Sequence, residues 1–186
     1  YQFLDANLAE HRLRQHTLET ALRAALREGR LELHFQPVVS IDDRAIVGAE
    51  ALLRWHDDEH GDVPPQVFVP LAEEAGLIHS LGEWVLRTAA AQVVAWRRAG
   101  LPLNVSVNLS ARQFYREDLA QRIVEIVREA GCEPSWLELE VTETSLLHDL
   151  DAIRRVLHQL REHGFRIAID DFGTGYSSLT HLKHFP

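Results

Sequence analysis

Regular alternation of strand and helix patterns after residue 103 is the feature that most limits the possible folds of this chain. Apolar and polar residues alternate over 103–110, 136–143 and 165–170, which is the period of a β-strand. Helical spacing fills 111–130 and 146–163 between them. A strand–helix repeat of about 30 residues predicts βαβ units and a parallel sheet. On this pattern alone, the sheet could be open and doubly wound or closed into a barrel.

The first hundred residues predict a different start to the same domain. The predicted strands over 31–40 and 45–55 are separated by a short turn. They are expected to form an antiparallel hairpin, because parallel strands need a longer crossover. The expected elements are a helix over 8–29, strands over 31–40 and 45–55, a polar loop over 56–65, and helices over 66–76 and 78–99.

Composition narrows the classes of function. The chain has 186 residues, 46% of them hydrophobic, which suits one domain with a real core. The net charge of −9 argues against a general nucleic-acid binder, so an anionic ligand would need local positive charge, most simply bound cations. One cysteine excludes an internal disulfide framework, and no apolar run approaches the length of a membrane span, so a soluble protein is expected. Without any methionine, Tyr1 is not a translation start, and the chain is expected to be part of a longer or processed protein.

Four oxygen-bearing side chains lie on matching faces of the predicted strands. Side chains alternate between the two faces of a strand, and Glu50, Asn108, Glu140 and Asp170 all fall on the face away from the β-branched row. Most of them stand near the C-terminal end of their strand. If the apolar row faces the helices, the other face points into a barrel, and these side chains converge where such barrels keep their chemistry.

Three carboxylates and an amide that converge need a cation. An all-oxygen set suits Mg²⁺, Mn²⁺ or Ca²⁺, and the lack of paired His or Cys ligands argues against zinc. Any one of these residues, taken singly, is more often a strand-end group facing water, and it is their common register that favours a metal site. The stretch DDFGTG (170–175) could be an acidic turn, a phosphate cradle or part of that site, but it lacks the lysine of a phosphate loop.

Two charged residues beside this set have open alternatives. Arg54, four residues after Glu50, could hold a phosphate through its guanidinium fork or form a surface salt bridge with Asp57 or Asp58. Glu143 could accept backbone N–H bonds from a neighbouring loop or simply begin the next helix.

Several motifs in a fixed order resemble those of one known family. They are FQP (35–37), EALLRW (50–55), FVPLAEEAGLI (68–78), NVSVNLSARQF (104–114), LELEVTET (137–144) and DDFGTGYSSL (170–179). From about residue 18 to the end, the chain resembles the EAL family of cyclic-di-GMP phosphodiesterases. The resemblance implies an α/β fold: a modified (β/α)8 TIM-type barrel with an antiparallel first strand, here incomplete, with about two final strands absent.

The resemblance also implies an activity and a set of site residues. In the family, two divalent metals, Mg²⁺ or Mn²⁺, hold the water that hydrolyses cyclic-di-GMP to linear pGpG, and Ca²⁺ is expected to inhibit. The positions that match the family's ligands of the first metal are Glu50, Asn108, Glu140 and Asp170, with Asp170 shared with a second metal that Asp171 also binds. The positions that match contacts to the dinucleotide are Gln36, Leu52 and Arg54, and Glu143 matches a glutamate that supports the loop 171–178.

The catalytic lysine and another second-metal glutamate of the family would follow Pro186, and Lys183 does not match that lysine. The parent protein is therefore predicted to be a metal-dependent phosphodiesterase, and residues 1–186 alone are predicted to be inactive. The alternatives are a non-catalytic cyclic-di-GMP receptor or interaction module and, as the plainest, an unrelated α/β domain with acidic strand ends.

The expected organisation has a linker or helix start over 1–17 and a partial EAL domain over 18–186. YQFLD (1–5) resembles the close of a GGDEF domain, so a GGDEF or sensory domain is expected upstream. A partial barrel exposes sheet edges, so the chain is expected to continue or to be completed by a partner or a domain swap. The other expectations are a homodimer, a cytoplasmic place in a bacterial signalling protein, no nucleic-acid polymer and no membrane contact from this segment.

Overall fold

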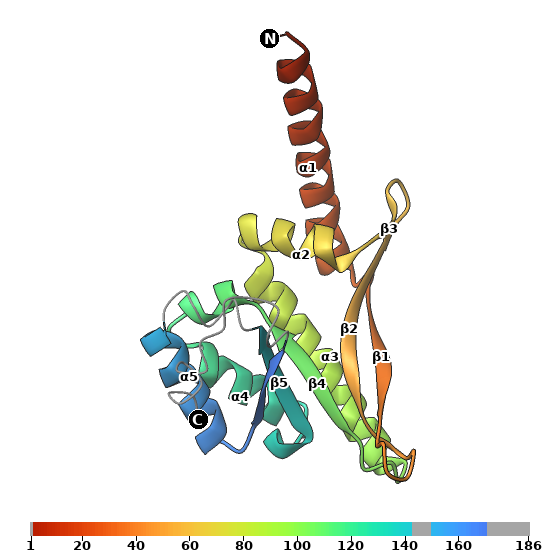
Figure 1. The fold of residues 1–186 in the computed structure, drawn as a ribbon, viewed down its shortest axis with the longest axis vertical. Helices are drawn as coiled ribbons and strands as arrows, with labels where there is room; N and C mark the ends of the chain where they lie inside the picture. The colour runs from red at the N-terminus through yellow and green to blue at the C-terminus, as the bar shows by residue number, and fades with distance from the viewer. Residues whose placement is uncertain (1, 143–149, 171–186) are drawn as a thin grey trace. The chain divides into compact units, whose positions relative to one another are not determined.

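The computed structural model describes the backbone of residues 2–142 and 150–170 and the side chains of 13–142 and 151–170 (Figure 1). The chain divides into two units, the first comprising residues 1–34 and 53–81 and the second residues 35–52 and 82–186. The elements are α1 (Gln2–Glu28), β1 (Leu31–Val39), β2 (Ile46–Asp57), β3 (Gly61–Val63), α2 (Pro65–Glu74), α3 (Ile78–Arg98), β4 (Asn104–Leu109), the 3₁₀ turn η1 (Ala111–Tyr115), α4 (Leu119–Glu129), the 3₁₀ turn η2 (Pro134–Trp136), β5 (Leu137–Thr142), α5 (Leu150–Glu162) and β6 (Arg166–Asp170).

One sheet of six strands runs through the molecule in the order β1-β2-β4-β5-β6, with β3 added to β2. Strands β2, β4, β5 and β6 pair in parallel, each with the next in this order. The turn between β1 and β2 is closed by the Ser40 N–H, which donates to the Ala45 carbonyl at 2.9 Å. A connection this short permits only antiparallel pairing, so the first strand opposes the others, as predicted. Among the described strands the order does not return from β6 to β1, so they form an open part of a barrel-type sheet.

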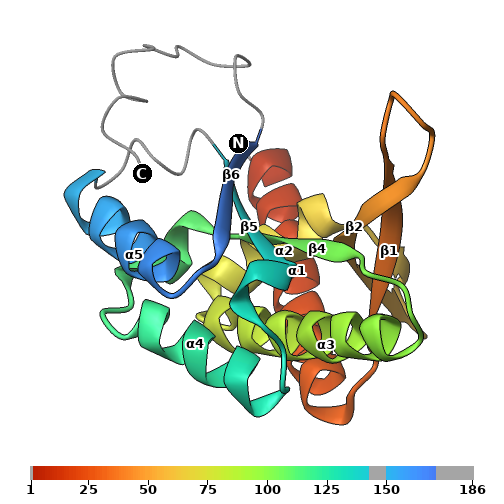
Figure 2. The same cartoon turned by 90° about the horizontal axis from the view of Figure 1, so that it is seen from below.

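Apolar side chains of the second unit face the helices and form its core. Val105, Val107 and Leu109 of β4 are buried, as are the alternate apolar residues of β5. Figure 2 shows α3, α4 and α5 lying along one side of β4, β5 and β6. Ile126 of α4 and Leu160 of α5 are fully buried on that side. The predicted apolar row therefore does face the helices, which leaves the polar row on the opposite face of the sheet.

The first unit has its own small core. Trp55 on β2 and Phe68 on α2 are almost fully buried, and their rings meet edge to face with centroids 5.7 Å apart. Leu18 and Leu22 of α1 are also buried, four residues apart on one helical stripe. No helix in the described ranges is long and apolar enough to cross a membrane.

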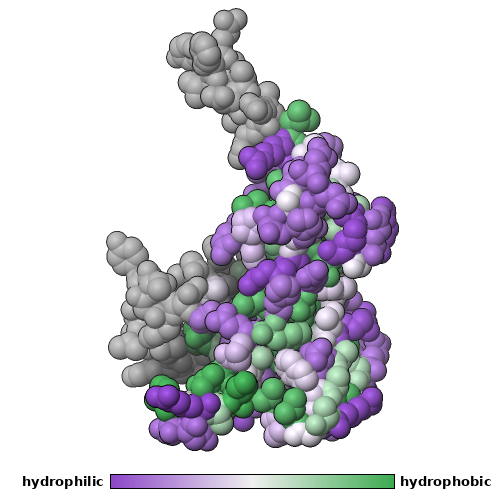
Figure 3. Space-filling view, turned by 90° about the vertical axis from the view of Figure 1, so that its right-hand side faces the viewer, coloured by the Kyte–Doolittle hydropathy of each residue, from purple (hydrophilic) through white to green (hydrophobic). Residues whose placement is uncertain are grey.

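The hairpin of β1 and β2 exposes apolar side chains, which gather on the face shown in Figure 3. Ile41, at its turn, is 96% exposed, and Val38, Val39, Ile46 and Val47 are about half exposed. Within the described sheet β1 has one strand neighbour, β2. Exposed apolar groups on an end strand are suited to further strand pairing.

Three elements differ from the sequence-based expectation. The first helix begins at Gln2 rather than at residue 8. The expected loop over 56–65 contains β3, because β2 continues to Asp57 and pairs back with the segment that ends at Val63. The helix expected over 111–130 is divided into η1 and α4, because the backbone at Arg116 is extended (φ −86°, ψ 117°) and interrupts it.

The turn between β2 and β3 depends on one buried carboxylate, and its removal is expected to destabilise the first unit. Asp57 is 6% exposed, and its Oδ1 accepts the N–H groups of Glu59 and His60 at 3.1 Å and the His60 Nδ1 at 2.7 Å. Asp57→Ala would leave these donors without their partner, so the free energy of unfolding at pH 7 is expected to fall by about 1–3 kcal/mol, measured by urea denaturation.

The pH dependence of this effect has a definite sign. The hydrogen bond from His60 lowers the pKa of Asp57, so the stabilisation is complete above the pKa of the unfolded carboxyl, about 3.9, and is lost as the pH falls through the lower folded value. The difference between wild type and Asp57→Ala should therefore shrink at strongly acidic pH. Asp62→Ala is the matched control, because Asp62 is exposed and pairs with His56 on the surface. An equal loss of stability in that variant would contradict the prediction.

Candidate metal centre

Strand register brings four of the predicted site residues onto one face of the sheet. Asn108 on β4 lies directly opposite Glu140 on β5. Glu50 on β2 lies opposite Ser106, one step of the same face before Asn108. Asp170 on β6 lies opposite Thr142, one step of the same face beyond Glu140. This is the arrangement that strand parity predicts, with a stagger between strands that is typical of tilted barrel strands. The role of these residues as metal ligands stays a prediction.

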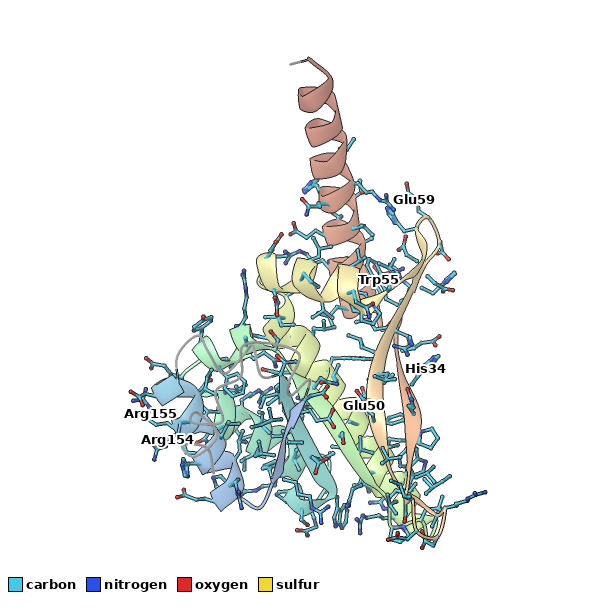
Figure 4. The ribbon with its side chains drawn as sticks, in the orientation of Figure 1. His34, Glu50, Trp55, Glu59, Arg154 and Arg155 are labelled. Atoms are coloured by element: carbon cyan, nitrogen blue, oxygen red, sulfur yellow. The ribbon has the colours of Figure 1, made fainter. Side chains whose placement is uncertain are left out.

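Direct contacts and charge connect the four side chains. The Asn108 Nδ2 donates to the Glu50 Oε1 at 3.0 Å, and Figure 4 shows Glu50 on β2. Burial raises the pKa of the Glu140 carboxyl, an effect that the neighbouring Ser106 hydroxyl opposes. The nearby charges of Glu50 and Asp170 raise the pKa of Glu140 further. Carboxylates from three strands thus act on one another electrostatically in this part of the sheet.

Ser106 and Glu138 belong to the same cluster and were not among the predicted site residues. The Ser106 Oγ donates to the Glu138 Oε1 at 3.4 Å, and the Glu138 charge also raises the pKa of Glu140. Both lie two residues before a predicted ligand, on the same face of the same strand. That spacing is the signal that could have identified them. Arg166 on β6 is the register partner of Glu138.

The donor chemistry fits a hard divalent cation. Carboxylate and amide oxygens are the ligands that Mg²⁺ and Mn²⁺ prefer, and such a cation offsets the repulsion among the three carboxylates. In the described part of the chain no group of three or more His, Cys, Asp or Glu side chains is close enough together to hold a metal ion. The pair already in contact is Glu50 with Asn108, whose amide can present its oxygen to a cation by turning about its last side-chain bond.

The other predicted site residues are placed as follows. Gln36 on β1 is exposed, and Leu52 is half-buried on the same face of β2 as Glu50. Arg54 belongs to the first unit, where its Nη1 donates to the Leu53 carbonyl at 2.9 Å. The residues Asp171, Glu143 and Lys183 lie outside the described residues.

The surface ion pair considered for Arg54 does not form. In the segment 53–81, which the structure describes throughout, Arg54 has no salt bridge with Asp57 or Asp58. Asp57 instead pairs with His60 and, at 3.8 Å, with Arg30. The ligand role of Arg54 stays a prediction.

Curated relatives share sequence with the whole chain. MucR of Pseudomonas aeruginosa, a bifunctional diguanylate cyclase/cyclic di-GMP phosphodiesterase, is 43% identical over 187 aligned residues, which cover all of this chain and 27% of MucR. The cyclic di-GMP phosphodiesterase NbdA of the same organism is 39% identical over 186 residues, which cover all of this chain and 24% of NbdA. The chain thus spans about a quarter of the length of these relatives.

Solved structures and a family model agree with these relatives. The PaMucR phosphodiesterase in complex with c-di-GMP superposes with a TM-score of 0.86 and 46% identity, covering 91% of this chain and 69% of that one. The EAL enzyme Bd1971, bound to cAMP and cyclic-di-GMP, gives a TM-score of 0.85 at 30% identity over all of this chain and 52% of that one. The model of the EAL domain matches residues 19–186, so the chain belongs to the EAL domain family.

Proposed function

We propose that the full-length protein hydrolyses cyclic-di-GMP to linear pGpG with the help of bound Mg²⁺ or Mn²⁺. The observation that carries the proposal is the common face of Glu50, Asn108, Glu140 and Asp170, three carboxylates and an amide on four adjacent parallel strands. The names of the relatives, which are cyclic di-GMP phosphodiesterases, support the same activity.

Each residue then has a definite task. Glu50, Asn108, Glu140 and Asp170 would hold the first cation, and Asp170 and Asp171 would hold the second. When bound, the two cations would supply an activated water and offset charge on the phosphodiester. Because these sites need near-octahedral oxygen coordination, the larger and more flexibly bound Ca²⁺ is expected to inhibit.

The substrate contacts come from β1 and β2. The guanidinium of Arg54 suits bidentate contact with a phosphate, and Leu52 offers an apolar surface on the same strand. Gln36 provides an exposed amide on β1. Glu143 supports the loop that follows Asp170, and the general acid/base lysine is expected after Pro186. The domain boundary at residue 18, an upstream GGDEF domain, a homodimer and a cytoplasmic location also remain predictions.

Product analysis with the full-length protein tests this function. In the presence of Mg²⁺ or Mn²⁺, chromatography should show cyclic-di-GMP converted to pGpG, and EDTA or Ca²⁺ should stop the reaction. Residues 1–186 alone should show no turnover. If the folded, metal-supplied full-length protein binds cyclic-di-GMP by calorimetry without converting it, the receptor function replaces this proposal. If it neither binds nor converts the dinucleotide, both are wrong.

A further inference from the structure

Asn108 depends on the backbone for its position. Its side chain is exposed and donates a hydrogen bond to Glu50, so among the described residues the backbone of β4 is the main constraint on where the amide lies. The next residue, Leu109, is 3% exposed and ends β4. Pairing with β5 holds the Asn108 backbone on one side, and the chain turns out of the strand at Ser110, two residues after Asn108.

The exit from β4 is held by reciprocal hydrogen bonds between Ser110 and Gln113. The Ser110 N–H donates to the Gln113 Oε1 at 2.9 Å, and the Gln113 N–H donates back to the Ser110 carbonyl at 3.0 Å; the Ser110 Oγ also accepts the Arg112 N–H at 3.2 Å. This is a capping box at the start of η1. Gln113 is 3% exposed, one of two buried polar residues in the described chain, so its side chain has little freedom to take another position.

A glycine on α3 provides the space that Gln113 occupies. A Cβ atom at Gly82 would lie 2.2 Å from the Gln113 Nε2, which is closer than non-bonded atoms can approach. The next residue on α3, Glu83, accepts hydrogen bonds from Arg116 at 3.0 Å and from Arg122 at 2.8 Å. Two consecutive residues of α3 thus contact the segment that leads from β4 into α4. Gly82 lies against Gln113 in η1, and Glu83 binds Arg116 and Arg122, which follow η1.

We propose that Gln113, seated against Gly82, is a positioning residue for the metal site: it holds the end of β4 so that Asn108 presents its amide to the cation. The inference rests on the proposed function for the role of Asn108. Residues that orient a metal ligand typically change metal affinity by about 10- to 100-fold when they are replaced. Glu83 binds the far end of the same connection and is expected to have no such effect, because its partners Arg116 and Arg122 follow η1.

The test measures Mn²⁺ binding by calorimetry, without substrate, in the full-length protein. Gln113→Leu, which keeps the volume but removes the acceptor, is expected to weaken Mn²⁺ binding about 10-fold and to speed hydrogen exchange at the Ser110 amide. Gly82→Ala should do the same by displacing the Gln113 amide. Gln113→Glu, which keeps an oxygen acceptor, should recover much of the affinity. At saturating metal, kcat should return close to the wild-type value.

Glu83→Gln is the matched control, because it weakens ion pairs on the same connection and should lower thermal stability while leaving Mn²⁺ affinity unchanged. If Gln113→Leu is folded and binds Mn²⁺ like the wild type, the inference is overturned. It is also overturned if Glu83→Gln and Gln113→Leu weaken binding equally, since general destabilisation would then explain both. Asn108→Ala distinguishes failure of this inference from failure of the proposed function. If that variant binds Mn²⁺ as tightly as the wild type, the assignment of the metal site is wrong.

Discussion

Glu140→Gln in the full-length protein is expected to lower the rate of cyclic-di-GMP hydrolysis by about 100- to 1,000-fold, a range typical for loss of one group that stabilises transition-state charge. Glu140 lies opposite Asn108 in the register, and the charges of Glu50 and Asp170 both act on it. Removing its charge therefore weakens cation binding at the centre of the set. Initial rates of pGpG formation at a series of Mg²⁺ concentrations measure the effect.

The same substitution should not weaken the fold. Burial raises the pKa of Glu140, so the metal-free folded state is least stable, relative to the unfolded state, when this carboxyl is ionised. Metal-free wild type should gain stability as the pH falls through the raised folded pKa towards the unfolded value, about 4.3, and Glu140→Gln should lack this gain. In EDTA at pH 8 the Tm of the variant should equal or exceed that of the wild type. Added Mg²⁺ should raise the Tm of the wild type alone, because a ligand stabilises only the state that binds it.

Glu138→Gln is the matched control, since Glu138 lies two residues away on the same face of β5 and is not an assigned ligand. Its hydrolysis rate should stay within a few-fold of the wild type. Equal losses of rate in the two variants would mean that any negative charge on this face supports hydrolysis equally. Full activity of Glu140→Gln would mean that Glu140 is not a metal ligand.

The parts of the fold that could be predicted are those in which apolar and polar residues alternate with a short period along the sequence. Val105 and Val107 alternate with Ser106 and Asn108, so the face of each side chain follows from the residue number, and the structure agrees. The stagger between strands could not be predicted in this way. Glu50 pairs with Ser106 rather than with Asn108, because strand tilt shifts the register, and tilt depends on the whole sheet.

The missed elements depend on contacts between distant segments. β3 has three residues, too few for an alternating pattern, and exists because Val63 pairs with Trp55. The break after η1 lies at the extended Arg116, and the start of η1 is capped by Gln113, whose buried position requires a glycine on α3. The helix propensity of residues 111–130 does not depend on that glycine, which lies on another element, so it could not predict the break. The assignments of Asp171 and Glu143 came from the resemblance to the EAL family, and neither residue lies in the described ranges.

Leu139→Ala, one residue before Glu140, is expected to give the opposite result to Glu140→Gln. Leu139 is fully buried on the helix-facing side of β5, and its register partner on β4, Val107, is 1% exposed. Truncating it leaves a cavity that the surrounding helices cannot fill, so the free energy of unfolding should fall by about 2–5 kcal/mol, measured by urea denaturation. Leu101→Ala, at a site 49% exposed, is the control and should have little effect.

Taken together, the two substitutions on β5 test whether one face of the strand binds the metal and the other stabilises the fold. At a temperature where Leu139→Ala is still folded, it should bind Mn²⁺ with nearly wild-type affinity, because Leu139 and Glu140 point to opposite sides of the sheet. Glu140→Gln should lose that affinity while keeping its Tm. If the folded Leu139→Ala variant loses Mn²⁺ binding and Glu140→Gln keeps it, the polar face of the sheet is not the metal-binding face, and the assignment of all four ligands fails with it.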